Sequence, residues 1–481
     1  MYGKENVKKG TVLLREQPFI YVLNSSLRTQ HCDYCFKKGE LLKCSNCQYV
    51  YYCGKVCQKE GWLLHKGECN SLRQVAPRMV PDAARLMARL IRKLNKGGDG
   101  IRAYYTRDRF RMFKDLMSHY GDLKSDERRL EHFMSLCGVL KEFLKDIMLP
   151  NSVELLGIYG RMCINSFNII DSEMKTLGTG IYLAASIIDH SCEPTAVAIF
   201  NGITLYIRSL CDMDFVDWSK VNISYIDVLN TPKDRQDELE KQYYFLCKCP
   251  RCIDDSILEI MTAAVCQNTK CDGYVNMCNV SAKDVVKCNK CYTQLDEEFI
   301  NKYLEVTEMN EMHIRSMNNL NSKNETTDLD VCKICLEKSK GILYKLNIQQ
   351  IKLLDSSFEC SIDLQQWENA KNYGTQLLEG YLYIIQEQNE FCVEYMRYLH
   401  QNNLHFSFRF YYKDYHPLLG LLYMKLSKVY NLFAEEKEAK KYLTSAFNIL
   451  KITHGVESPI FRNEIKPLME QLSVPRTLNG Y

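Results

Sequence analysis

Eight residues with zinc-ligand chemistry lie between positions 32 and 69, in the pattern C-x2-C-x8-C-x2-C-x5-C-x3-C-x7-H-x3-C. Structural zinc sites take four tetrahedral sulfur or nitrogen ligands, and a closely spaced cysteine pair supplies two of them from one turn. This spacing predicts two interleaved zinc sites. One set is Cys32, Cys35, Cys53 and Cys57, and the other is Cys44, Cys47, His65 and Cys69.

Two further cysteine groups lie in the second half of the chain. The motif C-x-C-x2-C at Cys247, Cys249 and Cys252 offers three thiolates, so a zinc ion there needs a fourth ligand from elsewhere in the fold. The pairs Cys266-x4-Cys271 and Cys288-x2-Cys291 have the form of a small zinc ribbon. They predict either a further zinc ion or free core and surface thiols.

The start of the chain argues against disulfides as the reason for these cysteines. The first ten residues, MYGKENVKKG, contain no apolar segment of a secretory signal, and no run elsewhere is long enough to span a bilayer. We therefore expect a protein of the cytoplasm and nucleus without a membrane partner. Clustered cysteines in such a reducing setting more often bind metal.

Hydrophobic patterning predicts the elements that position these ligands. Residues 11–14 and 19–23 predict two strands before the first zinc module, and 83–94 and 130–148 predict amphipathic helices after it. Two alternating runs between 196 and 207 flank Asn201-Gly202 and predict a hairpin, because both residues tolerate positive φ. A further strand is expected over 221–228.

The last third of the chain has helical patterning. The polar stretch 318–330 before it predicts a flexible linker or loop. A tetratricopeptide-type helix pair is indicated by apolar and small residues at its characteristic offsets, namely Tyr423, Leu426, Ser427, Tyr430, Ala439, Leu443 and Ala446. A generic helical bundle is the alternative.

Composition sets broader limits. A chain of 481 residues, 46% hydrophobic and 25% charged, is too long for one core and predicts two to four globular domains. The net charge of +3 demands neither nucleic acid nor an anionic membrane. Between Arg28 and Asn95, however, 13 Lys and Arg stand against 5 Asp and Glu. A solvated basic surface is favoured over a docking face, and direct DNA binding is weaker still, because no helix pattern suited to reading bases accompanies it.

Three more motifs follow in order: DHSCEP at 189–194, SYID at 224–227, and YYFLCKCPRC at 243–252. Together with the eight-ligand module they resemble the SET and MYND domain family of protein lysine methyltransferases, over nearly the whole chain. The resemblance implies a multidomain α+β fold. In it, a split SET β-fold is interrupted by a MYND zinc module and followed by a cysteine-rich post-SET segment and an all-α tetratricopeptide-like C-terminal domain.

The same resemblance implies domain boundaries. They are 1–29 for the N-terminal part of the SET domain, 30–70 for the MYND zinc finger, 71–150 for a helical SET insertion, 151–230 for the SET core, 231–300 for the post-SET segment and zinc ribbon, and 301–481 for the helical C-terminal domain.

The resemblance also implies roles for individual residues. Methyl transfer from S-adenosyl-L-methionine to a lysine amine would occur beside Tyr225, with Phe167 as an aromatic wall of the lysine channel. Cys192 would join Cys247, Cys249 and Cys252 around a third zinc ion. The expected cofactor contacts are His119, Asn165, Asp189, His190, Tyr225 and Phe245; for His119 an exposed histidine at a helix end is the alternative.

Two departures from the family pattern leave two functional interpretations open. The family's N-terminal G-x-G turn is absent, which predicts a truncated SET domain, and Asp189 stands where the family has Asn. One interpretation is a lysine methyltransferase of histone or other proteins with a lysine in an accessible peptide. The other is a catalytically weak or inactive scaffold that binds partners through the MYND module and the C-terminal helices. In both, the MYND module binds peptides, zinc is structural and the default state is a monomer.

Overall fold

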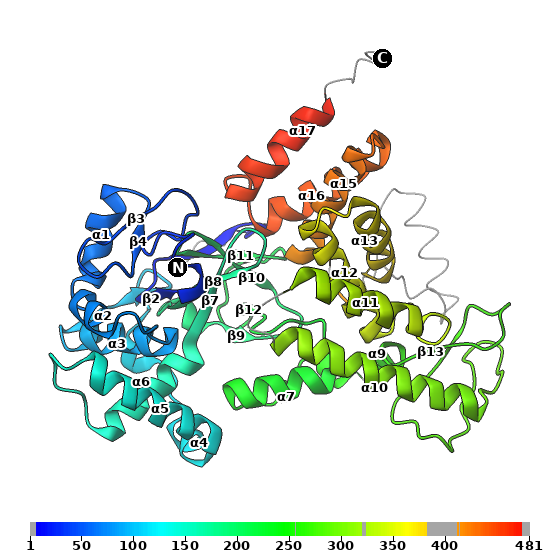
Figure 1. The fold of residues 1–481 in the computed structure, drawn as a ribbon, viewed down its shortest axis with the longest axis horizontal. Helices are drawn as coiled ribbons and strands as arrows, with labels where there is room; N and C mark the ends of the chain where they lie inside the picture. Colours follow the sequence, from blue (N-terminus) through cyan, green and yellow to red (C-terminus); the bar gives the residue numbers. More distant parts are fainter. Residues whose placement is uncertain (1–5, 255, 320–323, 382–410, 413, 474–481) are drawn as a thin grey trace.

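Two three-stranded antiparallel sheets lie at the centre of the computed structural model, which describes residues 6–254, 256–319, 324–381, 411–412 and 414–473 (Figure 1). The first has the order β1-β11-β10 and the second β2-β8-β7. Their bounds are β1 Val12–Glu16, β2 Ile20–Leu23, β7 Ser166–Ile170, β8 Thr176–Ile181, β10 Ala196–Asn201 and β11 Thr204–Ser209. The strands before the zinc module thus complete sheets whose other strands come after it, which is the split arrangement expected for the SET fold.

The hairpin is confirmed, but its turn lies one residue later than predicted. Asn201 pairs with Thr204 as the last rung of the ladder, so Gly202 and Ile203 form the loop. Gly202 takes the positive φ of +58° that a tight hairpin needs. A side chain there would also lie 2.7 Å from the carbonyl oxygen of Cys35, so the hairpin loop lies directly against the first zinc module.

The strand predicted over 221–228 is wrong for most of its length. Only β12, Asn222–Ile223, is a strand, and it pairs in parallel with β9, Asp189–His190. Beyond it the backbone bonds to side chains instead of to a neighbouring strand. The N–H of Tyr225 donates to His190 Nδ1 at 3.0 Å, and that of Leu229 donates to Asp227 Oδ1 at 2.9 Å.

Helices of the first half cover one side of the sheets and carry the zinc module at the far left of Figure 1. The helix predicted over 83–94 is α3, and the one predicted over 130–148 is α5, which begins three residues earlier because Asp126 caps it and ends at Phe143. The elements of this part are β3 Leu42–Lys43, β4 Tyr51–Tyr52, α1 Lys55–His65, α2 Cys69–Val75, α3 Asp82–Leu94, β5 Ala103–Tyr104, β6 Phe110–Arg111, α4 Tyr120–Ser125, α5 Glu127–Phe143 and α6 Ser152–Asn165, with short 3-10 turns η1 Ser25–Leu27, η2 Gly98–Gly100 and η3 Phe113–Asp115.

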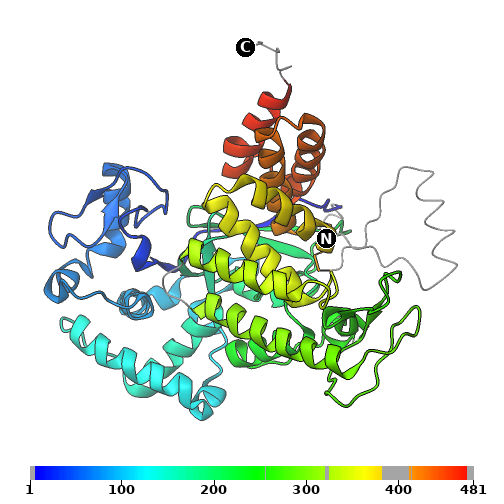
Figure 2. The ribbon, with the colours of Figure 1, turned by 45° about the vertical axis from the view of Figure 1, so that its right-hand side comes forward.

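The helical structure predicted for the last third of the chain is confirmed over the described residues there, whereas 382–410, 413 and 474–481 lie outside them. The C-terminal half as a whole is mostly helical, and in Figure 2 its helices lie in front of the central strands. The short 3-10 turn η4 Ala185–Ile187 precedes this half. The elements of this half are α7 Pro232–Tyr243, α8 Pro250–Ile253, α9 Ser256–Met261, β13 Ala264–Val265, β14 Tyr274–Val275, α10 Glu297–Asn319, α11 Glu325–Ser339, α12 Ile348–Asp363, α13 Trp367–Tyr381, α15 Pro417–Leu432, α16 Glu436–Thr453, the π-helical segment η5 Phe461–Ile465 and α17 Lys466–Ser473.

The linker predicted over 318–330 is shorter than expected. Helix α10 continues to Asn319 and α11 begins at Glu325, so only 320–323 of that stretch lie outside the described residues. Asn324 caps α11 by accepting from the N–H of Thr327. The polar residues of the stretch 318–330 therefore belong largely to the end of α10 and the start of α11.

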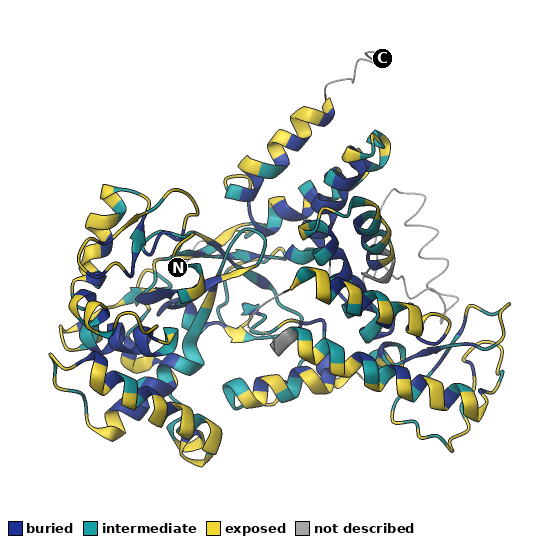
Figure 3. Ribbon diagram, viewed as in Figure 1, coloured by how far each residue is buried: buried dark blue, intermediate teal, exposed yellow. Residues whose placement is uncertain are grey.

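The helix pair α15 and α16 packs closely through small residues, as the offsets predicted. Ser427 Oγ donates to the carbonyl oxygen of Ala439 at 2.7 Å. A side chain at Gly420 would lie 2.9 Å from atoms of both Ile449 and Leu450. Helix α15 is dark blue over most of its length in Figure 3, whereas α16 buries one face, so α15 lies in the interior of the C-terminal domain and α16 covers it.

A buried cluster of four charges joins the zinc module to α3. Arg85 contacts Asp33 at 2.9 Å and Glu68 at 2.7 Å, and Arg89 contacts the same carboxylates at 2.8 and 2.6 Å. None of the four is more than 5% exposed. Burial alone would raise the pKa of Glu68, but the two guanidinium groups outweigh it and hold that pKa well below its usual range.

This cluster takes two arginines but also two carboxylates out of the charge count around the module, so the basic surplus there is unchanged and the prediction of a solvated basic surface stands. The two arginines, Arg85 and Arg89, are interior and neutralised. Helical spacing placed both on α3, but the carboxylates that receive them lie 17 to 56 residues away in sequence. Periodicity alone therefore could not show the pairing.

We predict that Arg85→Met lowers the free energy of unfolding by about 3–5 kcal/mol, because it leaves two buried carboxylates with one arginine. Urea unfolding followed by circular dichroism, at fixed zinc concentration, measures the change. The matched control is Arg78→Met, which breaks an exposed pair with Glu142 at 3.6 Å and should cost less than about 1 kcal/mol. Equal effects of the two substitutions would contradict the role of the cluster.

Candidate active site and zinc centres

Each predicted ligand set lies together in the fold, with all four ligand atoms within 4.8 Å of one another. Measured sulfur separations are 3.4 Å for Cys53–Cys57, Cys192–Cys252 and Cys266–Cys291, 3.7 Å for Cys35–Cys53 and Cys271–Cys288, and 3.8 Å for Cys44–Cys69. A disulfide needs about 2.05 Å, whereas a zinc–sulfur bond of about 2.3 Å gives a tetrahedron with edges of about 3.8 Å. The donor sets therefore fit zinc.

The two MYND sites share the strands β3 and β4 and the helix α1. His65 ends α1 and turns its Nε2 toward Cys47 Sγ at 3.4 Å. Its other ring nitrogen, Nδ1, lies 3.3 Å from Glu68 Oε1. A carboxylate behind a ligating histidine fixes the ring orientation, so the buried charge cluster also supports the second zinc site.

The post-SET cluster joins the end of β9 to the segment after α7. Cys192 meets Cys247, Cys249 and Cys252 there, as the family resemblance implied. Arg235 is fully buried beside it, 3.6 Å from Cys252 Sγ, and also donates to the carbonyl oxygen of Arg251 at 2.9 Å. A buried guanidinium compensates the negative charge of a four-thiolate site.

The fourth set lies far from the sheets, beside β13 and β14 at the right of Figure 1. Cys266 follows β13 directly, and Cys288 bridges to Val275 of β14. The N–H groups of residues 268, 273 and 290 each point at a cluster sulfur within 3.4 Å. Backbone donors arranged in this way stabilise thiolates and favour the ribbon over free thiols.

Tyr225 and Phe167, the predicted catalytic residues, line one cavity of about 670 Å³. Asn165 lies on the same wall. The cavity is enclosed by β7, β8, the segment after β12, the end of α7 and the start of α15, so the SET core and the C-terminal domain form it together.

The Tyr225 side chain is held in place through both its hydroxyl group and its ring. Its hydroxyl donates to the carbonyl oxygen of Ile188 at 2.5 Å, and its ring lies 5.0 Å from that of Tyr243. Burial raises the pKa of Tyr225, and Asp189 raises it further, so the phenol stays neutral. Burial also raises the pKa of Tyr243 to about 12.

Sequence reasoning missed Tyr243. It lines the cavity between Gln242 and the family-matched Phe245, and its ring contacts both Tyr225 and Phe245. The signal was the aromatic run at 243–245, of which only one member had been assigned a role.

His190 connects the post-SET zinc cluster to Tyr225. Its Nδ1 accepts from the N–H of Tyr225, which places the ring proton on Nε2, 3.3 Å from Cys192 Sγ. Burial lowers the pKa of His190 to about 4, so the ring is neutral. Both nitrogens are thus used within the protein, and only the ring face remains for a cofactor.

The other predicted cofactor residues form a continuous series of contacts on the far side of Tyr243. Asn165 Nδ2 donates to the carbonyl oxygen of Met117 at 2.8 Å, next to His119. The His119 ring lies 5.4 Å from that of Tyr244, and Phe245 lies 5.9 Å from His190. Asp189 is exposed and pairs through its backbone with β12.

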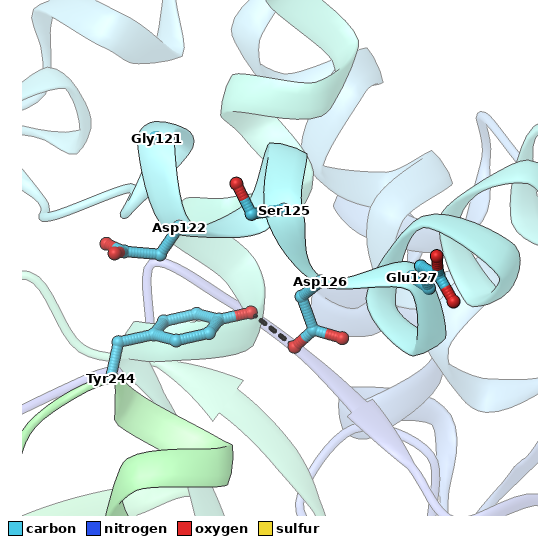
Figure 4. A pocket seen from close by; sticks show the side chains of 6 residues that line it. All are labelled: Gly121, Asp122, Ser125, Asp126, Glu127 and Tyr244. Atoms are coloured by element: carbon cyan, nitrogen blue, oxygen red, sulfur yellow. Dashed lines mark hydrogen bonds between the residues drawn. The ribbon is translucent and has the colours of Figure 1, made fainter.

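An open hollow of about 570 Å³ lies beside His119, and Tyr244 forms one wall of it (Figure 4). The Tyr244 hydroxyl donates to Asp126 at 2.9 Å, and His119 Nδ1 contacts Asp122 at 2.9 Å. Tyr244 has a positive φ of 60° at the end of α7. Neighbouring tyrosines therefore face different hollows: Tyr243 lines the cavity and Tyr244 lines the open one. His119 is the N-cap residue of α4 and is partly buried, so it lies at a helix end and also contacts Tyr244.

Comparison with known proteins supports the family resemblance of the chain. The MYND finger family matches residues 32–69. The chain is 27% identical to histone-lysine N-methyltransferase ASHR1 of Arabidopsis thaliana, with 98% of this chain and 92% of the relative covered. It is 28% identical to human histone-lysine N-methyltransferase SMYD3 and 24% identical to human N-lysine methyltransferase SMYD2, each over 96% of this chain and 93% of the relative. The predicted resemblance is confirmed.

Among the helices that the structure describes, none combines the length and the apolar character needed to cross a bilayer.

We predict four zinc ions per chain, measured by atomic emission on protein purified without chelator. Cys249→Ser and Cys288→Ser should each reduce the count by one, because each removes a thiolate from a four-ligand site. Cys211→Ser is the control and should leave four, since Cys211 bonds to Thr195 and belongs to none of the clusters. A count of three in the unaltered protein, unchanged by Cys288→Ser, would rule out the ribbon ion.

Proposed function

We propose that this chain is an S-adenosyl-L-methionine-dependent protein-lysine N-methyltransferase. The observation that carries the proposal is the position of Tyr225, fixed beside Phe167 and Tyr243 in a cavity shared by the SET core and the C-terminal domain. Similarity to lysine methyltransferases along almost the entire chain supports the same chemistry.

The residues around His190 fit the methyl donor. S-adenosyl-L-methionine supplies an electrophilic methyl group on a sulfonium. Aromatic faces at Phe245 and Tyr244 suit its planar and cationic parts, and the Asp189 carboxylate is exposed to receive an ammonium. We assign the cofactor contacts to these residues together with His119 and Asn165.

Tyr225 orients the lysine amine. Because its hydroxyl proton is held by Ile188, the oxygen lone pairs remain to accept a hydrogen bond in the cavity. Apolar walls, including Ile164 and Phe167, disfavour a desolvated ammonium and so favour the neutral, nucleophilic amine. In-line displacement of the methyl group needs no covalent intermediate with the protein. The chain therefore contributes positioning of the reactants and exclusion of water.

The alternative, an inactive scaffold, is favoured by no described feature of this site. Tyr225, Phe167 and Asn165 share the cavity, and Asp189 keeps an acceptor where the family has Asn. We propose that the substrates are histone or other proteins, in nucleus and cytoplasm, and that the MYND module binds peptides. DNA binding stays the weaker alternative, because no helix pattern suited to reading bases accompanies the basic surplus.

Calorimetry with S-adenosyl-L-methionine on zinc-loaded protein should give micromolar binding, and lysine peptides should be methylated. We predict that Tyr225→Phe keeps cofactor binding but lowers kcat by about 10²–10³, because the orienting oxygen is lost. Tyr206→Phe, on β11 outside the cavity, is the matched control and should keep full activity. Absence of binding heat from folded, zinc-loaded protein would refute the proposal and favour the scaffold.

A further inference from the structure

The cavity beside Tyr225 carries charge of one sign only. Among the described residues that line it, the charged ones are Asp227 and Glu238, with no lysine or arginine. The lining histidine, His416, is neutral because burial lowers its pKa to about 3. The cavity therefore presents two carboxylates and no compensating cation.

The two carboxylates lie on the open side of the cavity. Asp227 follows Tyr225 by two residues, and Glu238 shares one face of α7 with Gln242, one turn later, which also lines the cavity. Asp227 and Glu238 are both exposed, whereas Tyr225 is partly buried. The acidic pair is thus separated from the apolar inner wall, where a neutral amine is favoured.

Glu238 makes no hydrogen bond or ion pair within the part of the chain that the structure describes. Partial desolvation of its carboxyl group raises the pKa of Glu238 and the charge of Asp227 raises it further, while the ammonium of Lys352 lowers it. Two carboxylate groups that repel each other in this way would both be stabilised in their charged form by a cation placed between or beside them.

The surroundings are acidic as well. Lys352 of α12 interacts electrostatically with Asp227, Asp234, Glu238 and Glu311, so four carboxylates face one ammonium. That ammonium is held by the side chain of Asn230 at 2.5 Å, and burial lowers its pKa. Lys352 does not line the cavity, so it offsets the charge of Asp227 and Glu238 from outside the lining and shares that charge with Asp234 and Glu311.

We propose that Asp227 and Glu238 select peptides that carry a second basic residue near the lysine to be methylated. This inference rests on the proposed function and names the substrate class of that site. A guanidinium bonds to carboxylates bidentately, so arginine beside the target lysine is the preferred partner. An acidic residue at the same position is repelled.

The test uses peptides with one lysine in a neutral Ser/Ala/Gly background, capped at both ends. Arginine is placed in turn at each of about three positions on either side of the lysine, and citrulline, its neutral isostere, replaces it in matched peptides. Fluorescence anisotropy with labelled peptides measures Kd, and methyl transfer measures kcat/KM. We expect at least one position at which arginine gives about 5-fold tighter binding and higher kcat/KM, with a gain that falls as salt is added.

Glu238→Gln and Asp227→Asn should each reduce the arginine-to-citrulline ratio, and Glu238→Lys should invert it. Glu240→Gln is the matched control, because Glu240 is exposed on the same helix but does not line the cavity. Its ratio should equal that of the unaltered protein.

Equal binding and turnover of arginine and citrulline peptides, or a ratio that survives the double variant Asp227→Asn/Glu238→Gln, would overturn the inference while leaving methyl transfer intact. A protein that binds no S-adenosyl-L-methionine and methylates no peptide would refute the proposed function. A persisting arginine preference in anisotropy would then still support the acidic pair as a peptide-binding feature.

Discussion

The four-thiolate cluster at Cys192 is the interaction on which the candidate site depends. It joins the end of β9 to the segment after α7, two parts of the chain about 60 residues apart. On one side of it His190 orients Tyr225, and on the other the chain continues directly from Tyr243 and Phe245. Because a zinc tetrahedron fixes the relative positions of its ligands, a metal ion held there would align Tyr225 with Tyr243 and Phe245, the residues of the proposed site.

A second constraint acts on the zinc module. The buried pairs of Arg85 and Arg89 with Asp33 and Glu68 connect the module to α3, and Glu68 continues that network to the ligand His65. Buried ion pairs contribute little net stability compared with apolar packing, but they are highly specific in geometry. Their contribution here is orientation, which adds to the apolar packing of Phe36, Tyr49, Val50 and Tyr52 of the module against the strands and α3.

Much of this arrangement could be predicted from the sequence because its signals are local. Cysteine spacing indicated the MYND ligand sets, and apolar and alternating runs indicated β1, β2 and the hairpin of β10 and β11, whereas β7 and β8 were not predicted. The strand expected over 221–228 was wrong because backbone groups there bond to His190 and to side chains of the same segment, which alternation does not report. Glu238 and Tyr243 were missed because their importance comes from α7 lying across the cavity, a tertiary relation with no periodic signature.

The strands β1 and β2 find their partner strands late during synthesis of the chain. β1 pairs with β11 and β2 with β8, so residues 12–23 meet their partners only after position 176 or later has been made. At about 5–20 residues per second this is a delay of roughly ten seconds or more. The zinc module between them has all its ligands within residues 32–69 and can fold at once. Metal capture by a nascent chain would thus precede closure of either sheet, and two strands with unpaired edges would await their partners during that interval.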